Sequence, residues 1–335
     1  MIDLILHNGR FHTVDPKQPR AEAVAIDCGI LVAVGLDSEI LPLAQRGTEM
    51  VNLGGRSVTP GLIDAHVHFE RLAATLIRTN LSDVPSLQQA LQRVGRAAAG
   101  KSPDEWVHGY GWASDEWTDS TTPTAADLDR VAAHCPVLLD HKIFLHEAWV
   151  NSRALEIAAI SAQTPDPPGG KIQRDEHGNP TGILFEEAVT LVSMHVPPLS
   201  TPKLAEAMLK AQELCWQKGL VGLHDLDGAA SFRALQWLHQ QNELGLRVVK
   251  NLPVDLLGHA KTIGLQSGFG DEWLRIGSIK IFADGALGTR SALLYAPYAD
   301  DPHNCGIAVT DKEQLTEQAL QASEQGLSLA IHAIG

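Results

Sequence analysis

Cysteine and basic residues are both scarce in this 335-residue sequence. The cysteines are far apart and form no CxxC pair; they are Cys28, Cys135, Cys215 and Cys305. This pattern excludes a disulfide framework and is typical of reduced, buried thiols in a cytoplasmic protein. Lysine and arginine together number 26 against 40 acidic residues, giving a formal net charge of −14. Because nucleic acids and anionic membranes bind basic surfaces, this balance argues against both as partners.

Long apolar segments are also missing. No run reaches eighteen apolar residues, so we expect no membrane-spanning helix. The first residues, MIDLILHNGRFHTVD, lack a basic region followed by a long apolar region, so we expect no signal peptide and a cytoplasmic location. The chain is 44% hydrophobic and 20% charged, which is the composition of a globular protein with a large core.

The most informative stretch is VTPGLIDAHVHFE, at residues 58–70. Its apolar run predicts a strand, on which side chains two residues apart point to the same face. His66 and His68 therefore project together, with Asp64 on the same face as a deeper carboxylate or as a partner that fixes a histidine tautomer. Two such imidazoles are half of a metal site for Zn, Fe, Ni or Cu. The alternative is a chance pair in a chain with fifteen histidines.

A lysine lies inside a second apolar strand pattern, IGSIKIFADG at residues 276–285. Burying Lys280 is costly unless its charge is removed or paired. Reaction of the neutral amine with CO2 would give a carbamate, an anion able to bridge two metal ions. The alternatives are an ordinary lysine that reaches solvent and one that is paired with Asp284.

Strand and helix patterns alternate through the second half of the chain. Strands are expected at residues 219–225, 246–254, 276–285 and 327–335, and helices at 201–218, 231–242 and 315–325. This order predicts a parallel α/β sheet with functional residues at the carboxyl ends of its strands. The start of the chain differs, because short strand patterns there predict a small β-sheet; they lie at residues 2–6, 21–26, 30–34 and 51–53.

A long segment, at about residues 80–200, separates the histidine strand from the next strand of the parallel sheet. It is too long for a simple strand–helix unit, so we expect a sizeable insertion on the loop face of the sheet. Within it, residues 106–113 (WVHGYGWA) interleave aromatic residues with glycine. They predict a loop wall that approaches a ligand or, alternatively, a packed aromatic cluster. Residues 161–182, rich in Pro, Gly and Asp, predict a hairpin.

The stretch SVTPGLIDAHVHF, residues 57–69, resembles the first barrel strand of the amidohydrolase superfamily of metal-dependent hydrolases. The Lys280 segment and its continuation GALGTRSAL narrow the resemblance to amidohydrolase family 3, the branch that includes the N-substituted formamide deformylases. The resemblance implies an α/β fold with a (β/α)8 TIM-type barrel, incomplete here, over residues 57–335. It also implies that residues 1–56 are the N-terminal half of a β-sandwich.

The resemblance carries a set of site residues with it. The implied metal ligands are His66, His68, a carboxylated Lys280 and His332 in LSLAIHAIG. Two zinc ions are expected, with other divalent metals left open. The implied substrate-binding residues are Trp112, His146, Asp284 and Arg290. The alternative for His146 is a structural histidine that bonds to the backbone. The alternative for Asp284 and Arg290 is that they orient the metal ligands instead of contacting substrate.

The implied reaction is hydrolysis of a non-peptide, amide-like carbon–nitrogen bond by a metal-activated water. The aspartate that would serve as general base is expected after Gly335, so the sequence predicts a truncated chain and no catalytic residue is assigned within it. Two alternatives stay open: a catalytically incomplete fragment or binding scaffold, and a mononuclear cyclic-amidine deaminase, which uses no bridging lysine. The expected partner is a small amide-like substrate, and an incomplete sheet predicts self-association into a homo-oligomer.

Overall fold

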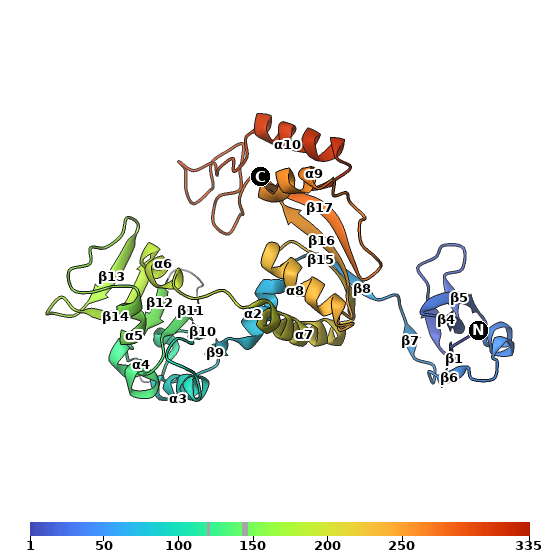
Figure 1. Cartoon of the computed structure of the whole chain (residues 1–335), viewed down its shortest axis with the longest axis horizontal. Coiled ribbons are helices and arrows are strands. Elements are labelled where there is room, and N and C mark those ends of the chain that lie inside the picture. The colour runs from blue at the N-terminus through green and yellow to red at the C-terminus, as the bar shows by residue number, and fades with distance from the viewer. Residues whose placement is uncertain (119–120, 143–146) are drawn as a thin grey trace. The chain divides into compact units, whose positions relative to one another are not determined.

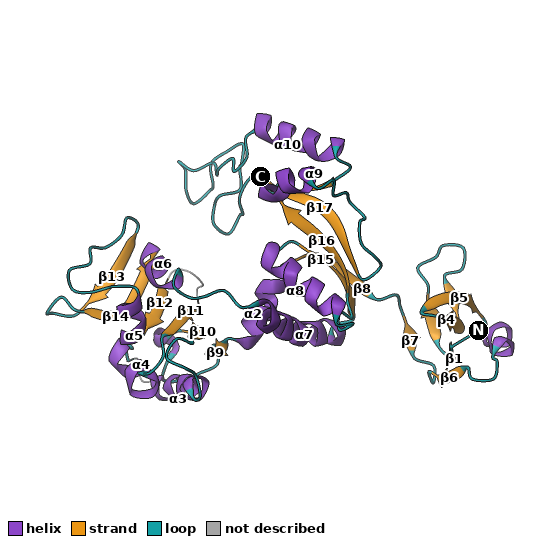
Figure 2. Ribbon diagram, in the orientation of Figure 1, coloured by secondary structure: helices purple, strands orange, loops and turns teal. Residues whose placement is uncertain are grey.

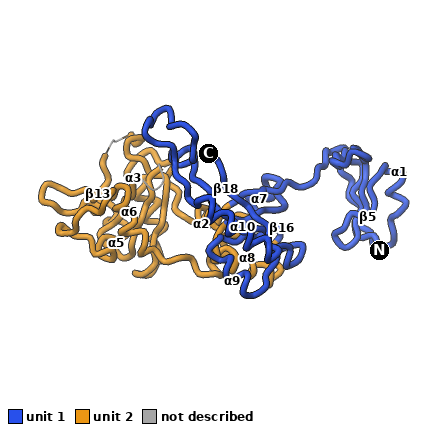
Figure 3. The backbone as a smooth tube through the Cα atoms, turned by 90° about the horizontal axis from the view of Figure 1, so that it is seen from above, with its two compact units in different colours: residues 1–67, 213–226, 245–335 blue, residues 68–212, 227–244 orange. Residues whose placement is uncertain are grey.

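The computed structural model describes residues 1–118, 121–142 and 147–335. The chain divides into two compact units, each discontinuous in sequence (Figure 3). Unit 1 comprises residues 1–67, 213–226 and 245–335, and unit 2 comprises residues 68–212 and 227–244. The boundaries expected from the sequence, residues 1–56 and 57–335 with an insertion at about 80–200, remain a prediction.

Short strands at the start of unit 1 form two small sheets (Figure 1). The first, ordered β5-β4-β1-β6, contains β1 (Leu4–His7), β4 (Ala23–Asp27), β5 (Ile30–Gly35) and β6 (Glu49–Asn52). The second, ordered β3-β2-β7, contains β2 (Arg10–His12), β3 (Arg20–Ala21) and β7 (Ser57–Val58). Each strand expected within residues 2–56 is therefore confirmed, with bounds that differ by a few residues.

The turn between β4 and β5 shows how the sequence closes this hairpin. Cys28 and Gly29 have φ values of 48° and 78°, so both central residues are left-handed, as a two-residue hairpin turn of type I′ requires. The hairpin then buries Ile5 and Ala23 against Ile40. The adjoining helices are α1 (Asp37–Ile40) and the 3₁₀ turn η1 (Leu41–Leu43).

The rest of unit 1 is built on a parallel sheet ordered β18-β17-β16-β15-β8 (Figures 1 and 2). Its strands are β8 (Leu62–Val67), β15 (Leu220–Asp225), β16 (Arg247–Pro253), β17 (Leu274–Phe282) and β18 (Ser328–His332). Its other helical segments are η3 (Val254–Leu256), α9 (Leu257–Thr262) and α10 (Lys312–Glu324). The strands expected in the second half of the chain are confirmed, and β-branched residues such as Val248 and Ile279 are buried in them.

The parallel sheet of unit 1 is open at both edges. Among the described residues, no further strand pairs with β8 or with β18. Leu62 and Ile63 of β8 are 59% and 63% exposed. A closed barrel has no such edges. This open parallel sheet agrees with the incomplete (β/α) barrel that the sequence predicts.

Unit 2 has its own sheet, ordered β13-β14-β12-β11-β10-β9, in which β9, β10 and β11 are parallel and the other pairings are antiparallel. Its strands are β9 (Thr79–Asn80), β10 (Val107–Trp112), β11 (Val137–His141), β12 (Glu147–Val150), β13 (Gly170–Arg174) and β14 (Pro180–Glu186). Its helical segments are α2 (Phe69–Ile77), α3 (Leu87–Ala98), η2 (Ser114–Glu116), α4 (Ala125–Ala132), α5 (Ser152–Ile157), α6 (Glu187–Ser193) and α8 (Ala229–Gln240). Helix α7 (Thr201–Gln217) begins in unit 2 and ends in unit 1.

Both faces of the unit 2 sheet are covered by apolar side chains. Val137 and Leu139 of β11 belong to one buried cluster, and Leu138 between them belongs to another. This alternation is that of a strand buried on both faces. The hairpin expected at residues 161–182 is confirmed as the antiparallel pair β13 and β14.

The loop wall expected at residues 106–113 is wrong, because β10 occupies this stretch as an internal strand of the sheet. Gly109 allows its neighbours to come close, since a Cβ there would lie 2.7 Å from the side chain of Leu139 and 2.8 Å from the carbonyl oxygen of Thr79. Gly111, with φ of 89°, lies where the register between β10 and β11 shifts. The interleaved glycines therefore serve strand packing.

Candidate active site

The carboxyl ends of the parallel strands in unit 1 form the candidate active site. These strands all run in one direction, so their carboxyl ends meet at one edge of the sheet, where such sheets carry catalytic residues. His66 lies near the end of β8, Lys280 near the end of β17, and His332 is the last residue of β18. Phe282 pairs in register with His332, so Lys280 and His332 come from neighbouring strands at this edge.

Lys280 is buried without a carboxylate partner. The residue is 5% exposed, and its Nζ lies 4.7 Å from the ring centre of Phe282. Among the described residues it makes neither an ion pair nor a hydrogen bond, so the alternative of a pair with Asp284 is not found. Burial lowers the pKa of the Lys280 amine, because the charged form loses the most hydration. The neutral amine is the form that reacts with CO2, so this environment suits a carbamate.

The partner of the His332 ring fixes which of its nitrogens can bind a metal. Nε2 lies 2.9 Å from the carbonyl oxygen of Gly285, and the ring centre lies 5.1 Å from that of Phe282. A carbonyl oxygen only accepts, so in the neutral ring Nε2 carries the hydrogen and Nδ1 carries the lone pair. His332 can therefore offer Nδ1 to a metal ion.

Asp284 anchors the backbone around this histidine. Its carboxylate accepts the backbone N–H groups of Ile334 at 2.9 Å, Leu293 at 2.9 Å and Gly335 at 2.7 Å. These bonds, with that from Ile334 the largest contribution, hold the pKa of the Asp284 carboxyl below its usual value. Asp284 therefore ties the segment after β17 to the residues after β18, and its substrate-binding role remains a prediction.

A second buried lysine, which the sequence analysis missed, lies on the adjacent strand β16. The Nζ of Lys250 is 2.7 Å from Asp225 of β15, and neither side chain is exposed. Asn251 adds a hydrogen bond of 3.3 Å from its side chain to the backbone carbonyl of Asp225. Lys250 could have been predicted from the sequence, because it lies inside an apolar strand pattern, as Lys280 does.

The two histidines at the end of β8 have different carboxylates nearby. The backbone N–H of His66 donates to Asp64 at 3.0 Å, so Asp64 fixes the strand end through the main chain. His68 follows the strand and is the N-cap residue of α2 in unit 2. Its Nδ1 lies 2.9 Å from Oδ1 of Asp227, also in unit 2. Asp227 was not among the residues predicted from the sequence. Its position just after the strand at residues 219–225, where parallel sheets carry functional residues, could have indicated it.

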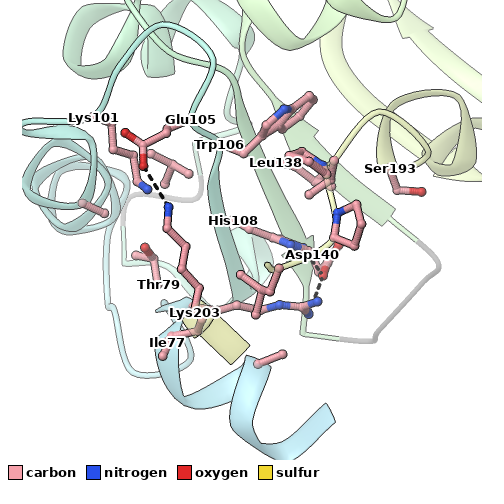
Figure 4. A pocket seen from close by; sticks show the side chains of 18 of the residues that line it. Ile77, Thr79, Lys101, Glu105, Trp106, His108, Leu138, Asp140, Ser193 and Lys203 are labelled. Atoms are coloured by element: carbon pink, nitrogen blue, oxygen red, sulfur yellow. Dashed lines mark hydrogen bonds and ion pairs between the residues drawn. The ribbon is translucent and has the colours of Figure 1, made fainter. Parts of the chain in front are cut away.

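Unit 2 also contains a cavity of about 850 Å³ (Figure 4). Its polar side carries His108 of β10, Asp140 of β11 and Arg78 at the end of α2. Asp140 Oδ2 lies 3.0 Å from Nε2 of His108 and 3.6 Å from the Arg78 guanidinium, whose pKa is lowered by burial. Apolar wall residues include Ile77, Leu138, Val196, Pro197 and Leu199. The Asp140 carboxylate is therefore shared by the His108 ring and the Arg78 guanidinium.

Trp112, an expected substrate-binding residue, is a core residue of unit 2. It is 1% exposed, and its indole N–H donates to the carbonyl oxygen of Leu139 at 2.9 Å. Its ring packs edge-on against Trp149 and His141, with centres 5.8 Å and 4.9 Å away. The alternative of a packed aromatic cluster describes this position, and a substrate contact remains only a prediction.

The other expected substrate-binding residues occupy different settings. His146 lies outside the described residues, so its role stays a prediction. Arg290 is half-exposed, has φ of 52° and pairs with Asp300 at 2.6 Å in the segment after β17. This surface ion pair accounts for the Arg290 guanidinium without a substrate.

A cluster of ligand-type side chains near the N-terminus has no further support as a metal site. Asp3, Asp27 and Cys28 bring their ligand atoms within 4.8 Å of one another in the described part of the chain. Asp27 raises the pKa of the Cys28 thiol and so opposes formation of the thiolate that a metal needs.

In the described part of the chain, every helix is too short or too polar to cross a bilayer.

Known proteins are similar to this chain over nearly its whole length. The sequence profile of the amidohydrolase family matches residues 49–335. YtcJ of Bacillus subtilis, named as an amidohydrolase, is 34% identical over 99% of this chain and 63% of its own length. The N-substituted formamide deformylase of Arthrobacter pascens is 30% identical over 100% of this chain and 64% of its own length. The chain thus spans less than two thirds of the length of these curated relatives.

Solved structures agree with the sequence comparison. A crystal structure of an uncharacterized metal-dependent hydrolase from Pyrococcus furiosus matches 99% of this chain and 67% of its own with a TM-score of 0.83, at 29% identity. A second uncharacterized metal-dependent hydrolase, from Pyrococcus horikoshii, matches 99% of this chain and 65% of its own with a TM-score of 0.79, at 29% identity.

Proposed function

This chain belongs to the amidohydrolase family, and on that premise we propose that it is part of a metal-dependent hydrolase of amide-like carbon–nitrogen bonds. The observation that carries the proposal is the buried amine of Lys280, which has no carboxylate partner among the described residues. It lies beside the strand of His332, whose Nδ1 carries the lone pair. The solved structures titled as metal-dependent hydrolases support the hydrolase part of this proposal, and the relative named as an N-substituted formamide deformylase supports an amide-like bond as its target.

The proposed ligands are His66, His68, His332 and Lys280 as its carbamate. The carbamate forms when the unprotonated Nζ attacks the carbon of CO2 and a proton is released, so a potential cation becomes an anion. Imidazole nitrogens and a carboxylate-like oxygen together bind zinc. They also bind other divalent ions of the first transition row. When bound, a divalent ion would lower the pKa of a water molecule and polarise the scissile carbonyl.

The chain's own residues would hold this centre in shape. The Gly285 carbonyl orients the His332 ring, and Asp284 fixes the backbone that follows His332. The Phe282 ring lies against Lys280 Nζ and limits the access of water to it. The family resemblance assigns the general base to an aspartate after Gly335, so none of these residues is proposed for that role.

The proposed substrates are small amides, and N-substituted formamides are the first compounds to test because one relative is named for their deformylation. An acyl group this small needs little room beside the reacting carbon, so longer N-acyl amides form the natural comparison series. The rates across that series would show how large an acyl group the site admits.

The test combines metal analysis with an assay of amide hydrolysis. The full-length wild-type protein that contains this chain is expected to bind up to two zinc ions and to release amine from a formamide. Lys280→Ala should lose bound metal and most of the rate, and added propionate, which supplies a carboxylate to the space that is left, should restore part of both. Wild-type protein that binds no metal and cleaves no amide would overturn the proposal. One metal per chain, ammonia release from a cyclic amidine and an unaffected Lys280→Ala variant would favour the deaminase instead.

A further inference from the structure

The loop that follows β15 places one carboxylate against the start of α2. Asp227 Oδ1 lies 2.9 Å from Nδ1 of His68, and Oδ2 accepts the backbone N–H of Glu70 at 2.6 Å. The Asp227 side chain is only 11% exposed. Both contacts lie within unit 2. One side chain therefore contacts a histidine ring and the first turn of the helix that this histidine begins.

This contact selects one tautomer of the His68 ring. An ionised carboxylate only accepts hydrogen bonds, so Nδ1 must carry the hydrogen that points at Asp227. In the neutral ring the lone pair then belongs to Nε2, which is the nitrogen able to bind a metal. A carboxylate behind an imidazole also raises the basicity of the opposite nitrogen, which strengthens its bond to a metal.

We infer that Asp227 is a positioning residue that fixes His68 with its lone pair on Nε2, the nitrogen that would bind a divalent metal ion, a role that rests on the proposed function. The opposite selection operates at His332, where the Gly285 carbonyl takes Nε2 and leaves Nδ1. The two histidines are therefore set to bind through different nitrogens. Asp227 supplies a full negative charge to its histidine, whereas Gly285 supplies only a carbonyl dipole.

A purely structural role for Asp227 would be to cap α2. The N-cap residue His68 makes no side-chain cap hydrogen bond, and the Asp227 carboxylate accepts a first-turn N–H in its place. Asp129 is a matched control for this role in the same unit. Its carboxylate accepts the backbone N–H of Ser152 at 3.1 Å and the Ser152 hydroxyl at 2.5 Å, at the start of α5 and without a histidine.

The decisive variant is Asp227→Asn, which keeps the size of the side chain. The Glu70 N–H needs an acceptor, so the amide oxygen turns to it and the NH2 group faces His68. An NH2 group donates, so Nδ1 must accept, and the ring changes to the tautomer with hydrogen on Nε2. That tautomer cannot offer Nε2 to a metal.

The tautomer can be read without any metal or activity. Long-range ¹H–¹⁵N spectra of the metal-free protein, labelled on histidine and assigned with His68→Gln, should show Nδ1–H in the wild type. Asp227→Asn should show Nε2–H, and its zinc affinity, measured by competition with a chelator, should fall about ten- to hundredfold. Asp129→Asn should leave both the tautomer and the affinity unchanged.

Three outcomes would overturn the inference: an unchanged tautomer in Asp227→Asn, an unchanged zinc affinity, or an equal loss of affinity in Asp129→Asn. Wild-type protein that binds no zinc at all would instead overturn the proposed function, and with it the metal-directed role of Asp227. The two failures are distinguishable because the tautomer is measured on metal-free protein.

Discussion

Two lysines on neighbouring strands of one sheet are both buried, yet their surroundings differ. Lys250 of β16 lies 2.7 Å from Asp225, with both side chains completely covered. Lys280 of β17 faces the Phe282 ring and has no carboxylate partner among the described residues. A buried ammonium must be paired or lose its charge. Lys250 meets this requirement with an ion pair inside the sheet, whereas the Nζ of Lys280 lies 4.7 Å from the centre of the Phe282 ring.

Under the proposed function, the partner of a buried lysine, rather than its burial, separates a structural role from a chemical one. The two strand patterns look alike in the sequence, since each places a lysine among apolar residues. Only the structure shows that Asp225 pairs with one lysine while Asp284 bonds to backbone amides and not to the other. The following variants test whether this distinction holds.

Lys250→Met should have the largest effect on stability. It removes the ion-pair partner of a fully buried carboxylate, a change that costs about 3–5 kcal/mol in comparable buried ion pairs. The measurement is the free energy of unfolding from urea titration. A loss below about 1 kcal/mol would show that Asp225 is not the charged partner that the 2.7 Å contact indicates.

The double variant Asp225→Leu with Lys250→Met should recover most of that loss. Replacing both partners of a buried ion pair by apolar residues of similar size is often neutral or stabilising, because no charge is left without a partner. The same urea titration compares the single and double variants. If the losses simply add, the two residues do not act as a pair.

Lys280→Met, studied in metal-free protein, should change the free energy of unfolding by less than about 1.5 kcal/mol, because the swap roughly conserves volume and breaks no ion pair. Zinc binding, measured on the same preparation, should nevertheless fall sharply. A stability loss as large as that of Lys250→Met would reveal a charged partner for Lys280 and remove the distinction between the two lysines.

Asp284→Asn should give the smallest effect, and one that depends on pH. The pKa of the Asp284 carboxyl is lower in the folded state than in the unfolded state. The ionised carboxylate therefore contributes its full stability above the unfolded pKa of about 4. This contribution is lost as the pH falls through the folded pKa. The difference in Tm between wild type and variant should therefore shrink from pH 7 to pH 3. A Tm difference that stays constant with pH would contradict the assignment of Asp284 as an ionised carboxylate bonded to backbone N–H groups. A change in zinc binding as large as that of Lys280→Met would make Asp284 part of the lysine site.

Local sequence patterns predicted the elements of this fold and the positions of several proposed site residues. Apolar runs rich in β-branched residues gave the parallel strands that carry His66, Lys280 and His332, because period and composition are local properties. The same reasoning failed at β10, where glycines that admit close strand packing resemble glycines that admit a ligand. A glycine pattern cannot tell which neighbour comes close.

The partners of these residues could not be predicted in the same way. Asp227 meets His68 across 159 positions of sequence, and Asp140 meets His108 across 32. No periodicity links residues so far apart, since the contact depends on how the elements pack. Trp112 illustrates the same limit, because its burial follows from the positions of Trp149 and Leu139 in the unit 2 core.

The insertion between β8 and β15 also constrains how the protein folds. Leu62 pairs in register with Leu220, so β8 leaves the ribosome long before its neighbour in the sheet exists. Such a non-local pairing forms slowly, whereas the two buried clusters of the unit 2 sheet lie within residues 81–196 and so precede β15 in the chain. Until β15 is made, β8 has no neighbouring strand with which to pair among the described residues.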